Sequence, residues 1–165
     1  MLALGYADAR ELFCAVRDAA REAERVRRSI ERMEAAEGVR AQGYEPATSH
    51  SRADPNGMAR TDARIDYEAL TARRVEEDYR LVDTACRAIY GATEDGRGGV
   101  CALMGAAVAD CMWWRFCAAA SWAEVADACG YSKSQARRLV AQGLDAVDFF
   151  GWPNLMGGEG AAQDV

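Results

Sequence analysis

Residues 121–144 read SWAEVADACGYSKSQARRLVAQGL, and the two helix-forming runs in this stretch decide the fold. Ser121 precedes the first run and Glu124 stands three residues later, which is the capping-box pattern of a helix start. Gly130 can adopt the left-handed conformation that a tight turn between helices requires. Ser132 can then cap the second run. The stretch therefore predicts a short helix, a glycine turn and a longer helix, which is the helix-turn-helix arrangement.

The second run separates into an apolar stripe and a polar face when it is placed on a helical wheel. The stripe spans about 140° at about 100° per residue and consists of Ala136, Leu139, Val140, Gly143, Leu144 and Val147. The opposite face consists of Ser134, Gln135, Arg138, Ala141 and Gln142, with Lys133 and Arg137 flanking the stripe. Side chains that are small and polar, amides or cations suit the phosphate oxygens and base edges of a DNA major groove. This face therefore predicts binding to duplex DNA.

The polar residues of this module have expected roles at a duplex. We expect the base-reading side chains to be Ser134, Gln135 and Arg138. Phosphate contacts are expected from Lys133 and Arg137, and from Ser121 and Trp122 at the start of the first helix. Ser132 and Gln142 complete the candidate DNA-binding set. The competing interpretation is an all-α core whose surface carries three cations by chance.

The same residues resemble a known DNA-binding module. Residues 121–147 are similar to the helix-turn-helix of sigma-factor region 4, and more closely to that of phage-encoded ArpU/RinA-type transcriptional regulators. The shared pattern is Trp122, Val125-Ala126, Gly130-Tyr131-Ser132, Arg138 and Leu144. The resemblance implies a regulator of phage or prophage late genes that could recruit the host RNA polymerase. It covers roughly residues 60–150 and is looser before them.

The chain departs from that family at two places. Three alanines occupy residues 118–120, where a glycine-containing turn is usual. Ala136 and Gly143 replace bulkier or better helix-forming residues. Gly143 is expected to weaken its helix by up to about 1 kcal/mol relative to alanine.

Two long helices are expected in the N-terminal part of the chain. Residues 8–37 carry a heptad seam of Leu12, Val16, Ala19, Ala23, Val26, Ile30 and Met33. Residues 62–91, with Asp62 as the N-cap and Gly91 as the stop, repeat the spacing at Ala72, Val75, Tyr79, Val82, Cys86 and Ile89. The intervening residues 38–61 are rich in glycine and proline and predict a loop that contains His50. The two helices could form a hairpin, a dimeric coiled coil, or both.

The expected organisation is all-α, with a helical, coiled-coil-like dimerisation region over residues 1–91 and a helix-turn-helix domain over residues 100–151. Residues 92–99 predict a second loop, and residues 100–118 a single apolar helix at the centre of the C-terminal domain. The MWWRF segment within that helix is interpreted as core. Residues 152–165 are expected to form a flexible tail.

Composition limits the other functional classes. The net charge of −6 does not suit a nonspecific DNA binder, but residues 132–144 carry three cations and no acid. The six cysteines form no CxxC pair and His50 is the only histidine, so we expect neither a zinc site nor a cofactor. We interpret the cysteines as buried, reduced thiols of a cytoplasmic protein. No run of residues approaches the roughly 20 apolar positions of a membrane span.

Two other functions remain open beside a dimeric regulator of transcription. A small terminase subunit also joins a helix-turn-helix to oligomerising helices, but it forms a ring that marks DNA for packaging. A helical adaptor that binds only proteins would have no affinity for DNA. An enzyme is not expected, because the chain has no Ser/His/Asp set and no phosphate-binding loop.

Overall fold

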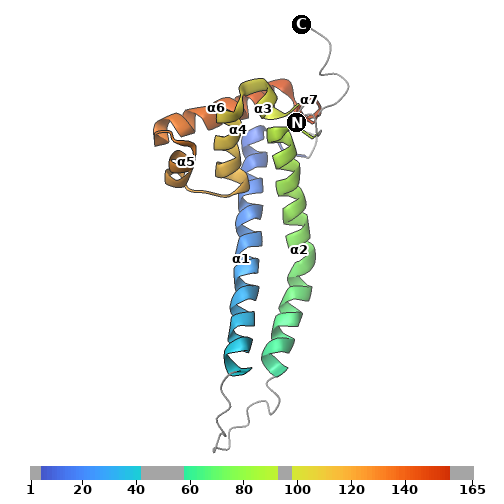
Figure 1. Cartoon of the computed structure of the whole chain (residues 1–165). Helices are drawn as coiled ribbons and strands as arrows, with labels where there is room; N and C mark the ends of the chain where they lie inside the picture. Colours follow the sequence, from blue (N-terminus) through green and yellow to red (C-terminus); the bar gives the residue numbers. More distant parts are fainter. Residues whose placement is uncertain (1–4, 42–57, 93–97, 157–165) are drawn as a thin grey trace, which may run out of the picture. The chain divides into compact units, whose positions relative to one another are not determined.

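The computed structural model describes residues 5–41, 58–92 and 98–156 (Figure 1). All regular structure in these ranges is helical, which confirms the predicted all-α class with two long helices ahead of shorter ones. The elements are α1 (Ala9–Ala41), α2 (Met58–Tyr90), α3 (Gly99–Met104), α4 (Ala106–Met112), the π-helix η1 (Trp113–Cys117), α5 (Trp122–Cys129), α6 (Lys133–Phe150) and α7 (Trp152–Leu155). None of the described helices is long and apolar enough to cross a membrane.

The ends of the long helices differ from the predicted ones. Helix α1 continues to Ala41, and α2 already begins at Met58, so Asp62 is an exposed residue inside α2 and not its N-cap. The predicted loop 38–61 is therefore too long at both ends, and its remainder, with His50, lies outside the described residues. The predicted stop is confirmed: Gly91 has φ 98° and its N–H donates to the Arg87 carbonyl at 2.8 Å.

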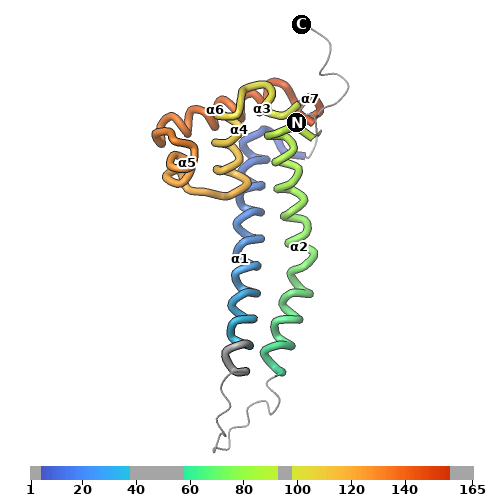
Figure 2. The backbone as a smooth tube through the Cα atoms, viewed as in Figure 1, coloured from blue at the N-terminus to red at the C-terminus, as the bar shows by residue number. Residues whose placement is uncertain are grey.

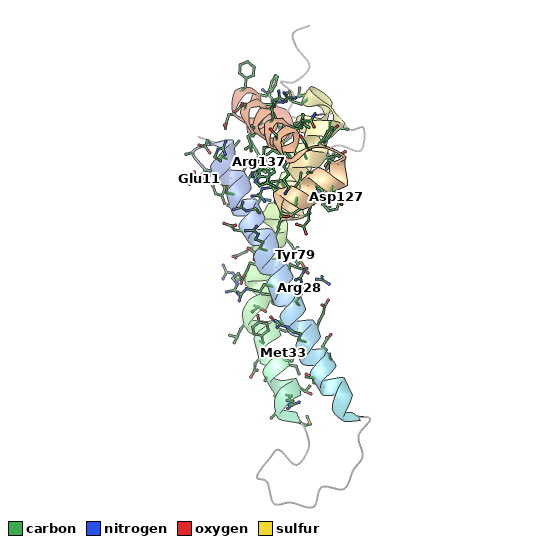
Figure 3. The ribbon with its side chains drawn as sticks, turned by 90° about the vertical axis from the view of Figure 1, so that its left-hand side faces the viewer. Glu11, Arg28, Met33, Tyr79, Asp127 and Arg137 are labelled. Atoms are coloured by element: carbon green, nitrogen blue, oxygen red, sulfur yellow. The ribbon has the colours of Figure 1, made fainter. Side chains whose placement is uncertain are left out.

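Residues 22–77 form one compact unit, in which α1 and α2 run side by side as a hairpin (Figure 2). The predicted seam of α1 is confirmed here, because Ala23 and Val26 are buried and Ile30 and Met33 are half-buried. Ion pairs join the helices: Arg74 lies 2.8 Å from Glu22, and Arg64 lies 3.0 Å from Glu37. Figure 3 labels Arg28 and Met33 on this part of α1.

The predicted seam of α2 is wrong at two of its six positions and confirmed at the other four, since Val75, Val82 and Cys86 are half-buried and Ile89 is buried. Ala72 and Tyr79 are exposed, whereas the buried residue of this part of α2 is Thr71, whose hydroxyl donates to the Tyr67 carbonyl at 2.8 Å. In residues 58–77 the inward face of α2 includes Arg64 and Thr71, whose side chains make hydrogen bonds, and a search for apolar spacing misses these two positions. The apolar positions with seven-residue spacing face outward instead, namely Met58, Ile65, Ala72 and Tyr79.

Residues 1–21 and 78–165 form a second compact unit, so the contacts divide the chain differently from the predicted domains. Leu12 and Phe13 of α1 and Ile89 of α2 are fully buried in the core that also holds Met112 and Val147. The first turns of α1 and the last turns of α2 thus belong with the helix-turn-helix.

The C-terminal tail begins later than predicted. Residues 152–155 form α7, and Trp152 and Leu155 are buried in the core of this unit. Their burial shows that residues 152–155 are part of the folded unit, in contrast to the predicted tail from residue 152. Residues 157–165 lie outside the described residues.

Residues 100–118 do not form the single helix that was predicted. Gly105, with φ 88° and ψ 163°, ends α3 and starts α4. Beyond α4 the chain continues as a π-helix, in which the Ala118 N–H donates to the Trp113 carbonyl at 3.0 Å. Ala119 then takes φ 53°, a left-handed conformation that glycine adopts without strain. It does so within residues 118–120, where a glycine was expected from the family pattern.

Candidate nucleic-acid interface

Helix α5 begins with the predicted capping box. The Ser121 hydroxyl accepts a hydrogen bond from the Glu124 N–H at 3.4 Å, and Glu124 Oε2 accepts one from the Ser121 N–H at 2.7 Å. The bond from the Ser121 backbone lowers the pKa of the Glu124 carboxyl, because it favours the charged form. The cap orients the exposed first turn of α5, which carries Trp122.

The turn between α5 and α6 has the predicted geometry. Gly130 adopts φ 71° and ψ 29°, the left-handed conformation that terminates a helix. The Tyr131 N–H donates to the Ala126 carbonyl at 2.9 Å, and the Gly130 N–H donates to the Asp127 carbonyl at 3.3 Å. These bonds satisfy the last carbonyl groups of α5 and fix the direction in which α6 leaves the turn.

A second capping box starts α6, and it engages the side chain of Gln135, one of the predicted base-reading residues. Ser132 Oγ accepts from the Gln135 N–H at 3.2 Å, while Gln135 Oε1 accepts from the Ser132 N–H at 3.1 Å and from the Ser132 hydroxyl at 2.9 Å. To read a base, the Gln135 side chain would have to leave this cap. Ser134 and Arg138 are exposed without such a role in capping.

The two predicted faces of α6 are confirmed by burial. The apolar stripe is buried at Ala136, Val140, Gly143, Leu144 and Val147 and half-buried at Leu139. The residues predicted to face DNA are exposed on α6, namely Lys133, Ser134, Gln135, Arg137, Arg138 and Gln142. Ser121 and Ser132 are exposed as well, and Trp122 is half-buried. The candidate set therefore lies on the start of α5, the turn and the solvent face of α6.

Gly143 has a packing role that its helix propensity does not show. A Cβ atom at this position would collide with Met112 Sδ and would lie 2.9 Å from Val108 Cγ1. Both neighbours belong to α4 and are buried. The absence of a side chain thus allows α6 to approach α4 closely.

Gly143→Ala is therefore expected to destabilise the protein by about 1–3 kcal/mol, since overpacking outweighs the gain of about 1 kcal/mol in helix propensity. Urea unfolding measures this difference. Gln142→Ala, at the exposed neighbouring position, is the control and should change the free energy of unfolding by less than about 0.5 kcal/mol. A Gly143→Ala variant more stable than the wild type would refute the packing role.

Two cations lie close to the Trp122 ring, one from the predicted DNA-binding set and one outside it. The guanidinium carbon of Arg137 is 5.5 Å from the ring centroid, and that of Arg115 is 4.5 Å from it. Arg115 comes from η1, and its Nη1 donates to the Ala120 carbonyl at 2.7 Å. Sequence reasoning missed Arg115 because it interpreted the MWWRF segment as core. The charge of Arg115 was the available signal, because a charged side chain within an apolar helix is costly unless it has a partner.

The cysteines do not form a metal centre in the described ranges. No group of three or more cysteine, histidine, aspartate or glutamate side chains there could hold a metal ion. All six cysteines are free; Cys111 is buried and the other five are half-buried. Burial raises the pKa of the Cys111 thiol to about 12, with a further contribution from its hydrogen bond with Cys129. This thiol is therefore not a nucleophile near neutral pH.

Comparison of the chain with protein-family models, with curated protein sequences and with solved structures gives no match.

Proposed function

We propose that this protein is a sequence-specific DNA-binding regulator of transcription that places the start of α6 in the major groove. The observation that supports this proposal most strongly is a helix-turn-helix with a capping box on both helices and an acid-free exposed face over residues 132–144. Two caps and a left-handed glycine hold α6 rigidly, and rigid presentation of cationic and polar side chains suits base readout.

The biological setting is a proposal from resemblance. Similarity of residues 121–147 to ArpU/RinA-type regulators supports a role at phage or prophage late genes, with the host RNA polymerase as a further partner. One module buries only about 600–1,000 Å² on DNA, so useful affinity calls for a homodimer on paired half-sites. A small terminase subunit is the second candidate, and native mass separates a dimer from a ring.

Fluorescence anisotropy with duplexes tiled across the DNA around the protein's own gene tests the proposal. Wild-type protein should bind one tile tightly and with strong salt dependence. Arg137→Ala/Arg138→Ala removes one proposed phosphate contact and one proposed base contact. We expect this variant to bind that tile about 100-fold more weakly. The lost base contact costs about 1–3 kcal/mol of binding free energy, and the lost phosphate contact adds to it.

Arg28→Ala/Arg32→Ala is the matched control. It removes the same charge from exposed positions of α1 in residues 22–77, outside the unit that holds α6, and should leave the affinity within about twofold. If folded wild-type protein binds no tile, or if the two double variants lose the same affinity, α6 is not the DNA-reading element.

A further inference from the structure

We infer that Arg17 and Arg21 of α1, together with Arg115 and Arg137 beside Trp122, form a binding site for phosphate groups, which holds the DNA backbone beside α6. This inference rests on the proposed DNA-binding function and extends it to α1 and η1, where sequence reasoning placed no site. All five residues belong to the unit of residues 1–21 and 78–165.

The indole of Trp122 organises one half of the site. Arg115 at 4.5 Å and Arg137 at 5.5 Å from the ring centroid are held by cation–π attraction, although they repel each other. Arg115 is fixed further by its bond to the Ala120 carbonyl. The Arg137 side chain stays exposed at the surface of α6 (Figure 3), where an incoming anion can reach it.

Helix α1 supplies the other half. Arg17 and Arg21 are one turn apart and therefore share a face of α1. Burial lowers the pKa of the Arg115 guanidinium, and the charges of Arg17, Arg21 and Arg137 lower it further. The packing agrees with this: the Phe13 ring, one turn before Arg17 on α1, lies 5.1 Å from the ring of Phe116, the neighbour of Arg115 in η1. This part of α1 therefore lies against η1.

Carboxylates neutralise this group only in small part within the described residues. The ion pair found there for the four arginines joins Arg17 Nε to Asp18 Oδ1 at 3.5 Å, and the Asp18 side chain is 67% exposed. That contact lacks hydrogen-bond geometry. Arg17 Nε is therefore without a hydrogen-bond partner, although it is shielded from solvent. Glu124, on the neighbouring first turn of α5, is committed to its capping box. Four cations with one exposed carboxylate partner, in a chain of net charge −6, indicate an external anion.

Phosphodiester oxygens fit this site better than isolated carboxylates do. Guanidinium groups donate two parallel hydrogen bonds to phosphate, and successive phosphates of a DNA strand present a row of charges. The site also includes Arg137, which flanks the candidate DNA-reading face of α6. A backbone strand held here would position α6 in the groove without reading sequence.

Arg17→Gln/Arg21→Gln tests the inference in the full-length protein, with a duplex of random sequence as the probe. We expect about tenfold weaker binding, and the slope of log K against log salt should fall by about 2, one for each lost phosphate contact. The preference for the specific tile over random duplex should stay unchanged. The melting temperature should not fall, because removing like charges relieves repulsion; a purely structural role predicts that it falls.

Arg28→Gln/Arg32→Gln is the matched control, with the same four-residue spacing on the same helix and the same change in charge. Equal DNA binding and equal salt slopes for the two double variants would overturn the inference even if Arg137→Ala/Arg138→Ala confirms the proposed function. If Arg17→Gln/Arg21→Gln unfolds, the single variant Arg21→Gln is used instead, because Arg21 is exposed. Its slope of log K against log salt should fall by about 1.

Failure of the proposed function has a different signature. If wild-type protein binds no duplex, inorganic pyrophosphate replaces DNA in a thermal-shift titration. If pyrophosphate stabilises the wild type but not Arg17→Gln/Arg21→Gln, the four arginines bind phosphate groups although the protein does not bind DNA. If pyrophosphate does not stabilise the wild type, the inferred phosphate site is refuted together with the proposed function.

Discussion

Gly99→Ala is expected to destabilise the protein by more than about 3 kcal/mol, because backbone strain and overpacking add at this position. Gly99 has φ +74°, a conformation that disfavours every residue with a Cβ atom. A Cβ atom here would collide with the Gly91 amide nitrogen and would lie 2.8 Å from Tyr90 C and 2.9 Å from the Ile89 carbonyl oxygen. These are all backbone atoms, so no side-chain rotation relieves the collision. The start of α3 would have to move away from the end of α2.

Urea unfolding followed by circular dichroism measures this effect, and Gly130→Ala is its control. Gly130 has nearly the same φ, +71°, but nothing lies within 4 Å of its Cβ position. Gly130→Ala should therefore cost about 1–2 kcal/mol, the strain of the left-handed conformation alone. If the two variants lose the same free energy of unfolding, the close approach of α3 to the end of α2 does not contribute to the effect of Gly99→Ala.

Phe13→Ala is expected to destabilise the unit of residues 1–21 and 78–165 by about 3–5 kcal/mol, the usual cost of truncating a buried phenylalanine. Phe13 is fully buried, and its ring centroid lies 5.1 Å from that of Phe116 in η1. The cavity would open in the core that supports the helix-turn-helix. Substitution in α1 should thus weaken DNA binding through loss of folded protein, although Phe13 is far from residues 121–144 in sequence.

Chemical denaturation measured by near-ultraviolet circular dichroism tests this prediction, since the tryptophans of the same unit report on its packing. Leu70→Ala is the control, because Leu70 is 83% exposed on α2 and its loss should cost less than about 0.5 kcal/mol. The same packing predicts that a fragment beginning at residue 100 does not fold. A Phe13→Ala variant as stable as Leu70→Ala would mean that the helix-turn-helix folds without α1.

The helix-turn-helix could be predicted because its signals are local. Ser121 and Ser132 cap helices through bonds to residues three positions later, and Gly130 turns the chain through its own φ. The buried stripe of α6 follows from the same short-range periodicity. Such features depend little on the rest of the chain, and the structure confirms each of them.

Features that depend on distant residues were missed. The inward face of α2 uses Arg64 and Thr71, whose burial is tolerated because Arg64 meets Glu37 from α1 and Thr71 bonds to its own helix. Gly143 was interpreted as a weak helix former because the contact with Met112 arises only in the fold. Arg115 was missed for the same reason, since its partner Trp122 comes from another helix.

The π-helix η1 has a consequence for the tolerance of this chain to insertions and deletions. Its turn closes between Trp113 and Ala118, five positions apart, whereas an α-helical turn closes over four. A helical wheel drawn from α4 through this turn therefore loses its phase and assigns later side chains to the wrong face. Deleting one residue from 113–117 would leave a regular α-helix, intact as a helix, but would rotate the side chains that precede the turn relative to those that follow it. The length of this segment, and not its composition alone, thus sets how the side chains of α4 are turned relative to those that follow Cys117.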